Sequence, residues 1–258
     1  MSVMDLFQLT GKTAIITGGG RGLGLQIAQA YAEAGIANLV LCSRSVETCQ
    51  QVADELGQQF DVKVLALKCD ITNPEDVQNV VAKTVETFGT IDILVNNSGA
   101  SWGERVEKMP KAAWDKVINI NVTGTFLMSQ AVGTIMIQQK FGKIINIASI
   151  AGFGGTPEFM QTIGYNTSKG AVLTFTKDLA VKWGRHQINV NAIAPGFFPT
   201  KMSSQLIEMG KEQILALTPL KRLGSEQDLK GAAVFLASAA SDYVTGAVLS
   251  VDGGASAL

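Results

Sequence analysis

Tyr165 and Lys169 are the two residues whose types and spacing point most directly to chemistry. They stand four positions apart, so on a helix their side chains would share one face about one turn apart. A free phenol has a pKa near ~10 and is a poor acid–base catalyst at neutral pH. A neighbouring ammonium favours the phenolate and lowers that pKa toward the working range. The pair therefore predicts a proton-transfer site, although two solvated residues on a helix surface would have the same spacing.

A glycine-rich segment near the start of the chain favours the catalytic interpretation. Residues 13–17 (Thr-Ala-Ile-Ile-Thr) predict a short buried strand, and Gly18-Gly19-Gly20-Arg21-Gly22-Leu23-Gly24 follows at once. Residues 25–35 then have helical apolar spacing and a glycine stop. In this context glycines let the backbone approach a pyrophosphate, and the helix N-terminus offers free N–H groups to its charge. The segment predicts a nucleotide site rather than a merely flexible loop.

Further motifs in the same order resemble the short-chain dehydrogenase/reductase family, and the resemblance covers nearly the whole chain. The family's Thr-Gly-x-x-x-Gly-x-Gly loop falls on Thr17, Gly18, Gly22 and Gly24. Its Asn-Asn-Ala-Gly motif falls on Asn96-Asn97-Ser98-Gly99, with Ser in place of Ala. Its Pro-Gly-x-x-x-Thr motif falls on Pro195, Gly196 and Thr200, and its terminal motif falls on Val251-Asp252-Gly253-Gly254. The resemblance implies a Rossmann-type fold, a nicotinamide cofactor and oxidoreductase activity.

The resemblance also implies the catalytic residues, which are Asn121, Ser149, Tyr165 and Lys169. In the reductive direction Tyr165 would donate its proton to the nascent alkoxide, and Ser149 would hydrogen-bond the carbonyl oxygen. Lys169 would lower the pKa of Tyr165 and hold the nicotinamide ribose, and Asn121 would anchor a water linking Lys169 to solvent. From the residues alone, Ser149 could equally be a strand-end hydroxyl bonded to backbone, and Asn121 a helix residue bonded to its own backbone.

The end of the second predicted strand indicates which nicotinamide cofactor is used. An acidic side chain there would pair with a ribose diol, whereas a base would accept a 2′-phosphate. Ser43 stands where NAD-using members carry their carboxylate, Arg44 follows it, and Arg21 lies in the glycine loop. A guanidinium can grip a phosphate with two parallel hydrogen bonds. These residues favour NADP(H) over NAD(H), unless both arginines are simply solvated.

The resemblance assigns the remaining cofactor contacts to the other strand ends. Asp70 would hydrogen-bond the adenine with Ile71 packing near it, Asn96 and Gly99 would line the ribose side, and Thr200 would hold the nicotinamide carboxamide. The expected cofactor-binding set is Gly18, Arg21, Gly22, Leu23, Gly24, Ser43, Arg44, Asp70, Ile71, Asn97, Gly99, Tyr165, Lys169, Pro195, Gly196, Phe198 and Thr200.

The composition of the chain bears on its partners, its cellular compartment and the presence of a metal. A net charge of −1 gives no sign of a nucleic-acid or anionic-membrane surface, and no apolar run reaches the ~18 residues needed to cross a bilayer. The three cysteines, Cys42, Cys49 and Cys69, lack metal spacing and suit reduced thiols, while the single histidine, His186, cannot build a multi-histidine metal site. We expect a cytoplasmic protein with no metal.

The elements that must position these residues alternate between strand and helix along the chain. The strands are expected at 13–17, 38–42, 62–68, 92–96, 143–148, 187–194 and 247–251, with helices at 25–35, 46–56, 74–88, 111–139, 164–183 and 227–240. Such alternation implies parallel strands joined by right-handed crossovers. A hydrophobic content of 47% fits strands covered on both faces. The prediction is an α/β protein with one domain over 1–258, a doubly wound sheet of about seven strands and helices on both faces.

Two irregular stretches, at about 150–164 and 197–223, are expected to form the substrate pocket, and the second is a candidate lid. Fifteen residues separate Ser149 from Tyr165, a few more than in many members of the family. The expected pocket residues are mostly apolar: Trp102, Phe153, Pro157, Phe159, Phe197 and Met202. No cluster of charges suits a phosphorylated or acidic substrate.

These features together predict an NADPH-dependent carbonyl reductase of the 3-oxoacyl type, similar to 3-oxoacyl-carrier-protein reductase-like members of the family. A sugar or polyol dehydrogenase, similar to gluconate 5-dehydrogenase-like members, is the alternative enzyme. An NADP-binding sensor or scaffold without catalysis is the alternative of another class. The family resemblance also implies a homotetramer, and we expect neither nucleic acid nor membrane as a partner.

Overall fold

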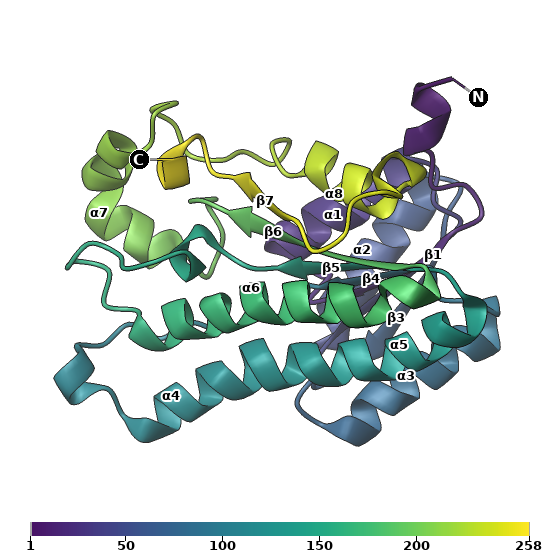
Figure 1. Ribbon diagram of the computed structural model, residues 1–258, viewed down its shortest axis with the longest axis horizontal. Coiled ribbons are helices and arrows are strands. Elements are labelled where there is room, and N and C mark those ends of the chain that lie inside the picture. Colours follow the sequence, from purple (N-terminus) through teal and green to yellow (C-terminus); the bar gives the residue numbers. More distant parts are fainter. Residues whose placement is uncertain (1, 258) are drawn as a thin grey trace.

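The computed structural model describes residues 2–257 and contains a seven-stranded, fully parallel sheet (Figure 1). The order across the sheet is β3-β2-β1-β4-β5-β6-β7. The strands are β1 (Thr13–Thr17), β2 (Asn38–Ser43), β3 (Lys63–Lys68), β4 (Ile93–Asn96), β5 (Gly142–Ile147), β6 (Ile188–Pro195) and β7 (Val248–Val251). The order reverses between β1 and β4, and in such sheets the crevice at the reversal is where ligands bind.

The strands form here because their side chains are buried on both faces of the sheet. Every residue of β1, β4 and β5 is buried. Successive side chains of β1 enter opposite cores: Ile15 packs in one apolar cluster and Ile16 in the other. A parallel sheet covered on both sides explains why these segments read as continuous apolar runs rather than alternating ones.

The helices cover the two faces in separate groups (Figure 1). One group, α1 (Gly22–Glu33), α2 (Val46–Gln59) and α8 (Lys230–Ala237), packs on the face of Ile16, and the other, α3 (Pro74–Phe88), α5 (Thr125–Gln139) and α6 (Ile163–Trp183), packs on the face of Ile15. Two further helices, α4 (Lys111–Ile118) and α7 (Ser204–Leu217), lie toward the end of the molecule where the strands finish.

The predicted doubly wound fold is confirmed, and the differences from the sequence prediction concern where elements begin and end. The single helix expected over 111–139 is interrupted by a π-helical turn, Asn119–Gly124, between α4 and α5. The helix expected over 227–240 is shorter, because Ser238 leaves helical geometry and a 3₁₀ turn follows. The segment 197–223 contains α7, which has non-helical backbone angles at Gly210.

The helical run Lys111–Gln139 needs a separate comment, because it is long and apolar enough to cross a membrane by length and composition alone. Its most apolar window has a mean hydropathy of 1.3, and half of that window is buried inside the protein. The α5 part packs Met128, Val132 and Met136 into the core beneath the sheet. This burial is what a core helix of a globular domain shows.

Candidate active site

The glycine loop after β1 is shaped by contacts that leave no room for side chains. Gly18 and Gly22 have positive φ values of 67° and 55°, which favour glycine. A Cβ on Gly24 would lie 2.3 Å from the Gly18 carbonyl oxygen. Asn97, directly after β4, donates from Nδ2 to the Thr17 carbonyl over 2.9 Å. The loop is thereby held against the end of β4, with the N-terminus of α1 facing the space above it.

That space is a cavity of about 900 Å³ at the carboxyl ends of the strands. It runs from the glycine loop to α7 and is lined by residues from distant parts of the chain. Of the expected site residues, it is lined by Gly18, Arg21, Gly22, Leu23, Ser43, Arg44, Asp70, Ile71, Asn97, Gly99, Ser149, Phe153, Tyr165, Lys169, Pro195, Gly196, Phe197, Phe198, Thr200 and Met202.

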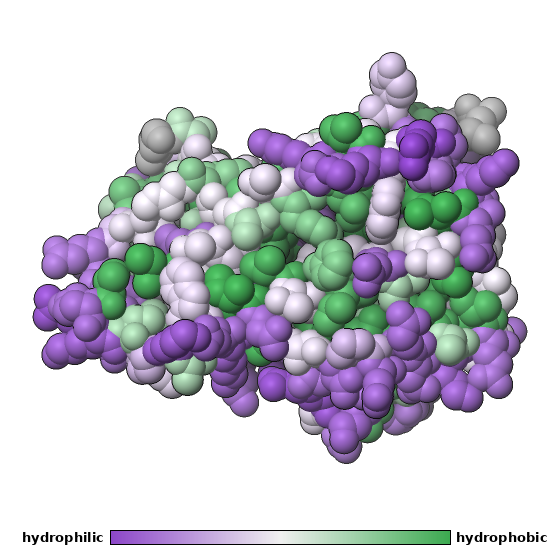
Figure 2. Space-filling model, turned by 60° about the horizontal axis from the view of Figure 1, so that its bottom comes forward, coloured by the Kyte–Doolittle hydropathy of each residue, from purple (hydrophilic) through white to green (hydrophobic). Residues whose placement is uncertain are grey.

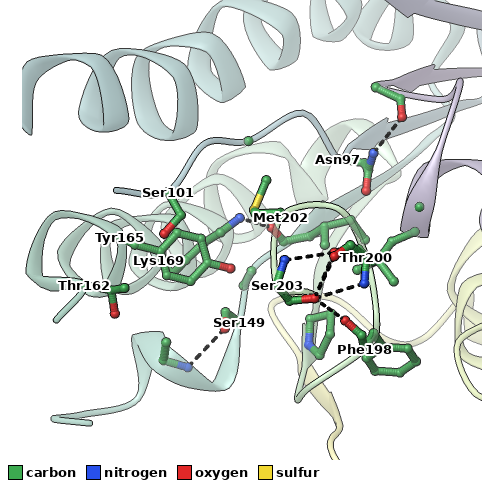
Figure 3. Close-up of a pocket in the computed structure, with 18 of the residues that line it drawn as sticks. Asn97, Ser101, Ser149, Thr162, Tyr165, Lys169, Phe198, Thr200, Met202 and Ser203 are labelled. Carbon is green, nitrogen blue, oxygen red and sulfur yellow. Dashed lines mark hydrogen bonds between the residues drawn. The ribbon is translucent and has the colours of Figure 1, made fainter. Parts of the chain in front are cut away.

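Ser149, Tyr165 and Lys169 gather on one side of this cavity (Figure 3). Ser149 follows β5 in an extended conformation, and its hydroxyl accepts a hydrogen bond from the Ala151 N–H over 3.2 Å. Tyr165 and Lys169 lie on the first turns of α6. The Lys169 Nζ donates to the Ile147 carbonyl over 2.7 Å and lies 5.5 Å from the centre of the Tyr165 ring.

Burial controls the ionisation of both groups on α6. Burial raises the pKa of the Tyr165 phenol, and the neighbouring Ser149 hydroxyl acts in the opposite direction. Burial lowers the pKa of Lys169 to about 8. The pKa of Tyr165 is therefore raised, and not lowered as expected, because burial disfavours the phenolate more than the Ser149 hydroxyl favours it.

Asn121 does not line the cavity itself, and its expected role of anchoring a water behind Lys169 stays a prediction. Its side chain is 1% exposed in the π-helical turn. Oδ1 accepts from the Ala100 N–H over 2.7 Å, while Nδ2 donates to the Ala100 carbonyl over 2.9 Å and to Ser168 Oγ over 2.8 Å. Ser168 Oγ in turn donates to the Tyr165 carbonyl over 2.7 Å. Asn121 thus ties the segment after β4 to the turn of α6 that carries Tyr165.

Two further residues of the expected set, one in the glycine loop and one at the end of β4, do not line the cavity either. Gly24 packs against Gly18 and does not line the cavity. Asn96 is buried within the sheet, where Nδ2 donates to Ser129 Oγ and to Asn146 Oδ1 over 2.9 Å each. Both residues act on the cavity only through the neighbours that they hold in place.

The glycine loop and the end of β2 each present one arginine to the cavity, and neither presents an acid. Arg21, Ser43 and Arg44 all line it. The Ser43 hydroxyl donates to the Ser45 carbonyl over 2.7 Å, which fixes the turn into α2. Across this end of the cavity, Asp70 accepts from the Thr72 N–H, and this bond is the largest cause of a lowered pKa at its carboxyl. The arrangement leaves a positively charged wall beside a carboxylate.

Ser203 is a further residue of the cavity wall that the sequence did not predict. It lines the cavity, and its hydroxyl accepts from the Thr200 N–H over 3.0 Å and lies 3.0 Å from Thr200 Oγ1 (Figure 3). It also hydrogen-bonds the Phe198 carbonyl. The sequence contained a signal for this turn between Thr200 and Ser203, namely a hydroxyl residue three positions after Thr200 and just before a helix. Ser203 fixes Thr200, which stands against Gly22 of the glycine loop.

Trp102 and Phe159 do not line the cavity, contrary to expectation. The Trp102 side chain is 43% exposed on the outer surface. Phe159 packs against Gly210 of α7 instead. Of the predicted aromatic and thioether set, Phe153, Phe197 and Met202 do line the cavity, as does Pro157. Residues that were not predicted also line it: Ser101, Thr162 and Lys201.

Among residues 2–257, no three His, Cys, Asp or Glu side chains come together in a metal-binding arrangement. Cys42, Cys49 and Cys69 are buried free thiols. His186 lies in a short turn after α6, where its Nε2 accepts from Arg185 Nε. A phenol, a hydroxyl and an amine thus lie together on one side of the cavity, and the glycine loop forms another part of its wall.

Comparison with known proteins gives matches along nearly the whole chain. The family described as Enoyl-(Acyl carrier protein) reductase matches residues 18–256. A 2-dehydro-3-deoxy-D-gluconate 5-dehydrogenase from Dickeya dadantii (strain 3937) is 41% identical over 259 residues, covering 98% of this chain and 98% of that protein. A 3-oxoacyl-(acyl-carrier-protein) reductase from Aquifex aeolicus (strain VF5) is 34% identical over 247 residues, covering 96% of this chain and 98% of that protein.

A solved structure of a relative has the same fold along the whole chain. A gluconate 5-dehydrogenase from Burkholderia cenocepacia J2315, in complex with NADP and tartrate, superposes with a TM-score of 0.93. It is 35% identical in sequence, and the match covers 100% of both chains.

Proposed function

Because the chain belongs to the short-chain dehydrogenase/reductase family, we propose that it transfers hydride reversibly between NADP(H) and a ketone or secondary-alcohol carbon. The protein is an oxidoreductase acting on CH–OH or C=O groups. The observation that carries the proposal is the convergence of Ser149, Tyr165 and Lys169 on one side of the cavity that begins at the glycine loop. The whole chain, 1–258, acts as one domain in this proposal.

The residues of the cavity fit a dinucleotide phosphate. Close packing at Gly18 and Gly24 keeps the backbone free of side chains where a pyrophosphate would lie. Arg21 and Arg44 line the cavity, where their guanidinium groups would hold a 2′-phosphate, and Ser43 gives no carboxylate to repel it. The solved Burkholderia relative contains NADP. These observations support NADP(H) as the preferred cofactor.

In the proposed mechanism the bound nicotinamide supplies or accepts the hydride, and the protein handles one proton. In the reductive direction, Tyr165 Oη donates its proton to the oxygen that becomes the alcohol. Burial raises the pKa of this phenol, which keeps the proton on it until the alkoxide forms. Ser149 Oγ donates a hydrogen bond to the same oxygen as charge develops there. Lys169 places a cation beside the phenolate that remains.

The substrate end of the cavity favours a ketone with an apolar part. Phe153, Phe197 and Met202 line it together with Met160, Leu206 and Leu217. This lining supports a 3-oxoacyl substrate, the class named for the Aquifex relative. Apolar walls gain free energy by covering an acyl chain and gain little from sugar hydroxyls.

A sugar-acid dehydrogenase is the second candidate, and one observation favours it. Lys201 lines the cavity directly after Thr200, where its ammonium could pair with a substrate carboxylate. The Dickeya and Burkholderia relatives are named for gluconate-type substrates. Replacement Lys201→Ala separates the two candidates: it should raise the KM of a keto acid severalfold and leave the KM of an uncharged ketone unchanged.

A substrate panel tests the proposal, with turnover followed at the nicotinamide absorbance and with NADPH and NADH in parallel. The panel should contain a 3-ketoacyl thioester, 5-ketogluconate and simple ketones. Turnover of the thioester but not of 5-ketogluconate supports the first candidate, and the reverse supports the second. NADPH binding without turnover of any member of a broad panel would support a sensor or scaffold instead.

We further propose that the protein is a cytoplasmic homotetramer with no nucleic-acid or membrane partner. The three free, buried thiols suit a reducing compartment. Apolar side chains gather over the helical face seen in Figure 2, and Phe126 of α5 and Val181 of α6 are exposed. Light scattering after size exclusion tests the assembly directly, because a monomer would contradict it.

A further inference from the structure

Helix α7 lies over the substrate end of the cavity, and its own fold contacts are few. Leu206 and Leu217 of α7 line the cavity. A second stripe, Ile207, Gly210 and Ile214, is buried on the side facing away from solvent. Ile207 and Ile214 belong, with Met160, to a small apolar cluster separate from the two main cores, and Phe159 packs against it. The position of α7 therefore depends on this small cluster.

The stripe has a gap at Gly210 into which a ring from another segment fits. Gly210 has φ −131° and ψ 24°, which interrupts the regular helix. A Cβ on Gly210 would lie 2.4 Å from Cε2 and 3.0 Å from Cδ2 of Phe159. Atoms that close must move, so the ring of Phe159 occupies the space that any side chain at residue 210 would need.

The segment that carries Phe159 is itself held firmly on its other side. Asn166 of α6 donates from Nδ2 to Thr156 Oγ1 over 3.1 Å, and its Oδ1 accepts from Thr162 Oγ1 over 2.9 Å. The Glu104 N–H donates to the Gln161 carbonyl over 2.8 Å. The segment between Ser149 and Tyr165 is thus a fixed support beside the catalytic turn, and Phe159 is the part of it that reaches α7.

We propose that Phe159 and the gap at Gly210 form a latch that sets how closely α7 covers the substrate, which makes Phe159 a positioning residue for Leu206 and Leu217. This inference rests on the proposed function for the substrate itself. It assigns a second purpose to the long segment between Ser149 and Tyr165: besides lining the cavity with Phe153 and Pro157, the segment supports α7 through Phe159.

A double-mutant cycle with Phe159→Ala and Gly210→Ala tests the latch. Gly210→Ala forces the added methyl against the ring, so we expect α7 to move outward. The KM for acetoacetyl-CoA should rise severalfold, with a smaller change in kcat and none in NADPH binding. Trypsin should cleave faster after Lys211, which is exposed on α7. The Phe159→Ala variant lacks the ring. Adding Gly210→Ala to it should therefore change neither the KM nor the rate of trypsin cleavage further.

Gly231→Ala is the matched control, because it adds a methyl to helix α8 at a glycine with nothing within 4 Å of the new atom. The latch is contradicted if Gly210→Ala behaves like Gly231→Ala, or if it has the same effect with and without the Phe159 ring. Phe159→Leu replaces Phe159→Ala in the cycle if the smaller residue prevents folding. The trypsin measurement needs no substrate, so the latch can be judged even if acetoacetyl-CoA is not turned over.

Discussion

The Lys169 ammonium sits in a place that is unfavourable for a charge, with 5% of the residue exposed and one carbonyl as its hydrogen-bond partner. Its pKa falls to about 8 in the folded protein, against about 10.4 in an unfolded chain. Below pH 8 both states carry the charge, and the folded state bears the full cost of burying it. Between about pH 8 and 10 the folded state releases the proton first, so Lys169 opposes folding less as the pH rises.

This linkage predicts how Lys169→Met changes stability with pH. The variant loses the hydrogen bond to the Ile147 carbonyl, but it no longer buries an ammonium. Removing the buried charge should stabilise the folded state by up to about 3 kcal/mol at pH 7. The difference in free energy of unfolding between variant and wild type should shrink from pH 7 to pH 10. Urea unfolding of both proteins at several pH values measures it, since the other titrating groups cancel in the difference. A difference that stays constant or grows with pH would contradict the linkage.

At the same scale, residue types and spacing predicted that Tyr165 and Lys169 lie together at the cavity, but they did not predict every pocket wall. Tyr165 and Lys169 could be found because helix geometry fixes where residues four apart lie. Trp102 and Phe159 could not be placed, because an aromatic residue in a loop has no periodicity to show which way it points. The raised pKa of Tyr165 also escaped prediction, because it depends on burial by residues far away in the chain.

At the scale of elements, the π-helical turn Asn119–Gly124 is the clearest departure from the sequence pattern. The apolar period through 111–139 continues across the turn, so it predicts one unbroken helix. The turn is stabilised by three hydrogen bonds of the Asn121 side chain to Ala100 and Ser168. Such contacts join residues distant in sequence and leave no periodic signal.

The Asn121→Ala variant tests the importance of this turn. It leaves the part-buried N–H and carbonyl of Ala100 without their partner inside the protein. A fully buried group in this state costs about 1–3 kcal/mol, so we expect a loss of about 1–2 kcal/mol in the free energy of unfolding. The Gln130→Ala variant, on the exposed side of α5, is the control and should change stability little. Equal stability of the two variants would mean that Asn121 does not hold the turn.

At the scale of the whole molecule, the alternation of strands and helices was enough to predict the sheet and its helical layers. Right-handed crossovers leave few ways to arrange parallel strands joined by helices. The exact order β3-β2-β1-β4-β5-β6-β7 brings six strand ends to one cavity. The shape of the substrate end was beyond prediction, because α7 and the segment before α6 are placed by a few apolar contacts such as Phe159 with Gly210.

Cofactor preference can be measured on the intact protein by thermal unfolding. A ligand at 100 times its Kd stabilises the folded state by about 2.7 kcal/mol, which is about 5–10 °C for a chain of this size. We expect NADPH to raise the Tm more than NADH does at equal concentration. The Ser43→Asp variant, which places a carboxylate where the 2′-phosphate would lie, should reverse this order. An unchanged order in the variant would show that the end of β2 does not select the cofactor.

The Tyr165→Phe variant tests the central claim most directly, because it removes only the hydroxyl that is proposed to donate the proton. NADPH binding, measured by fluorescence titration, and turnover of an accepted ketone should be determined on the same preparation beside the wild type. We predict unchanged NADPH affinity and turnover reduced by at least about 10²-fold. Turnover at the wild-type rate in this variant would contradict the proposed role of Tyr165 and the mechanism built on it.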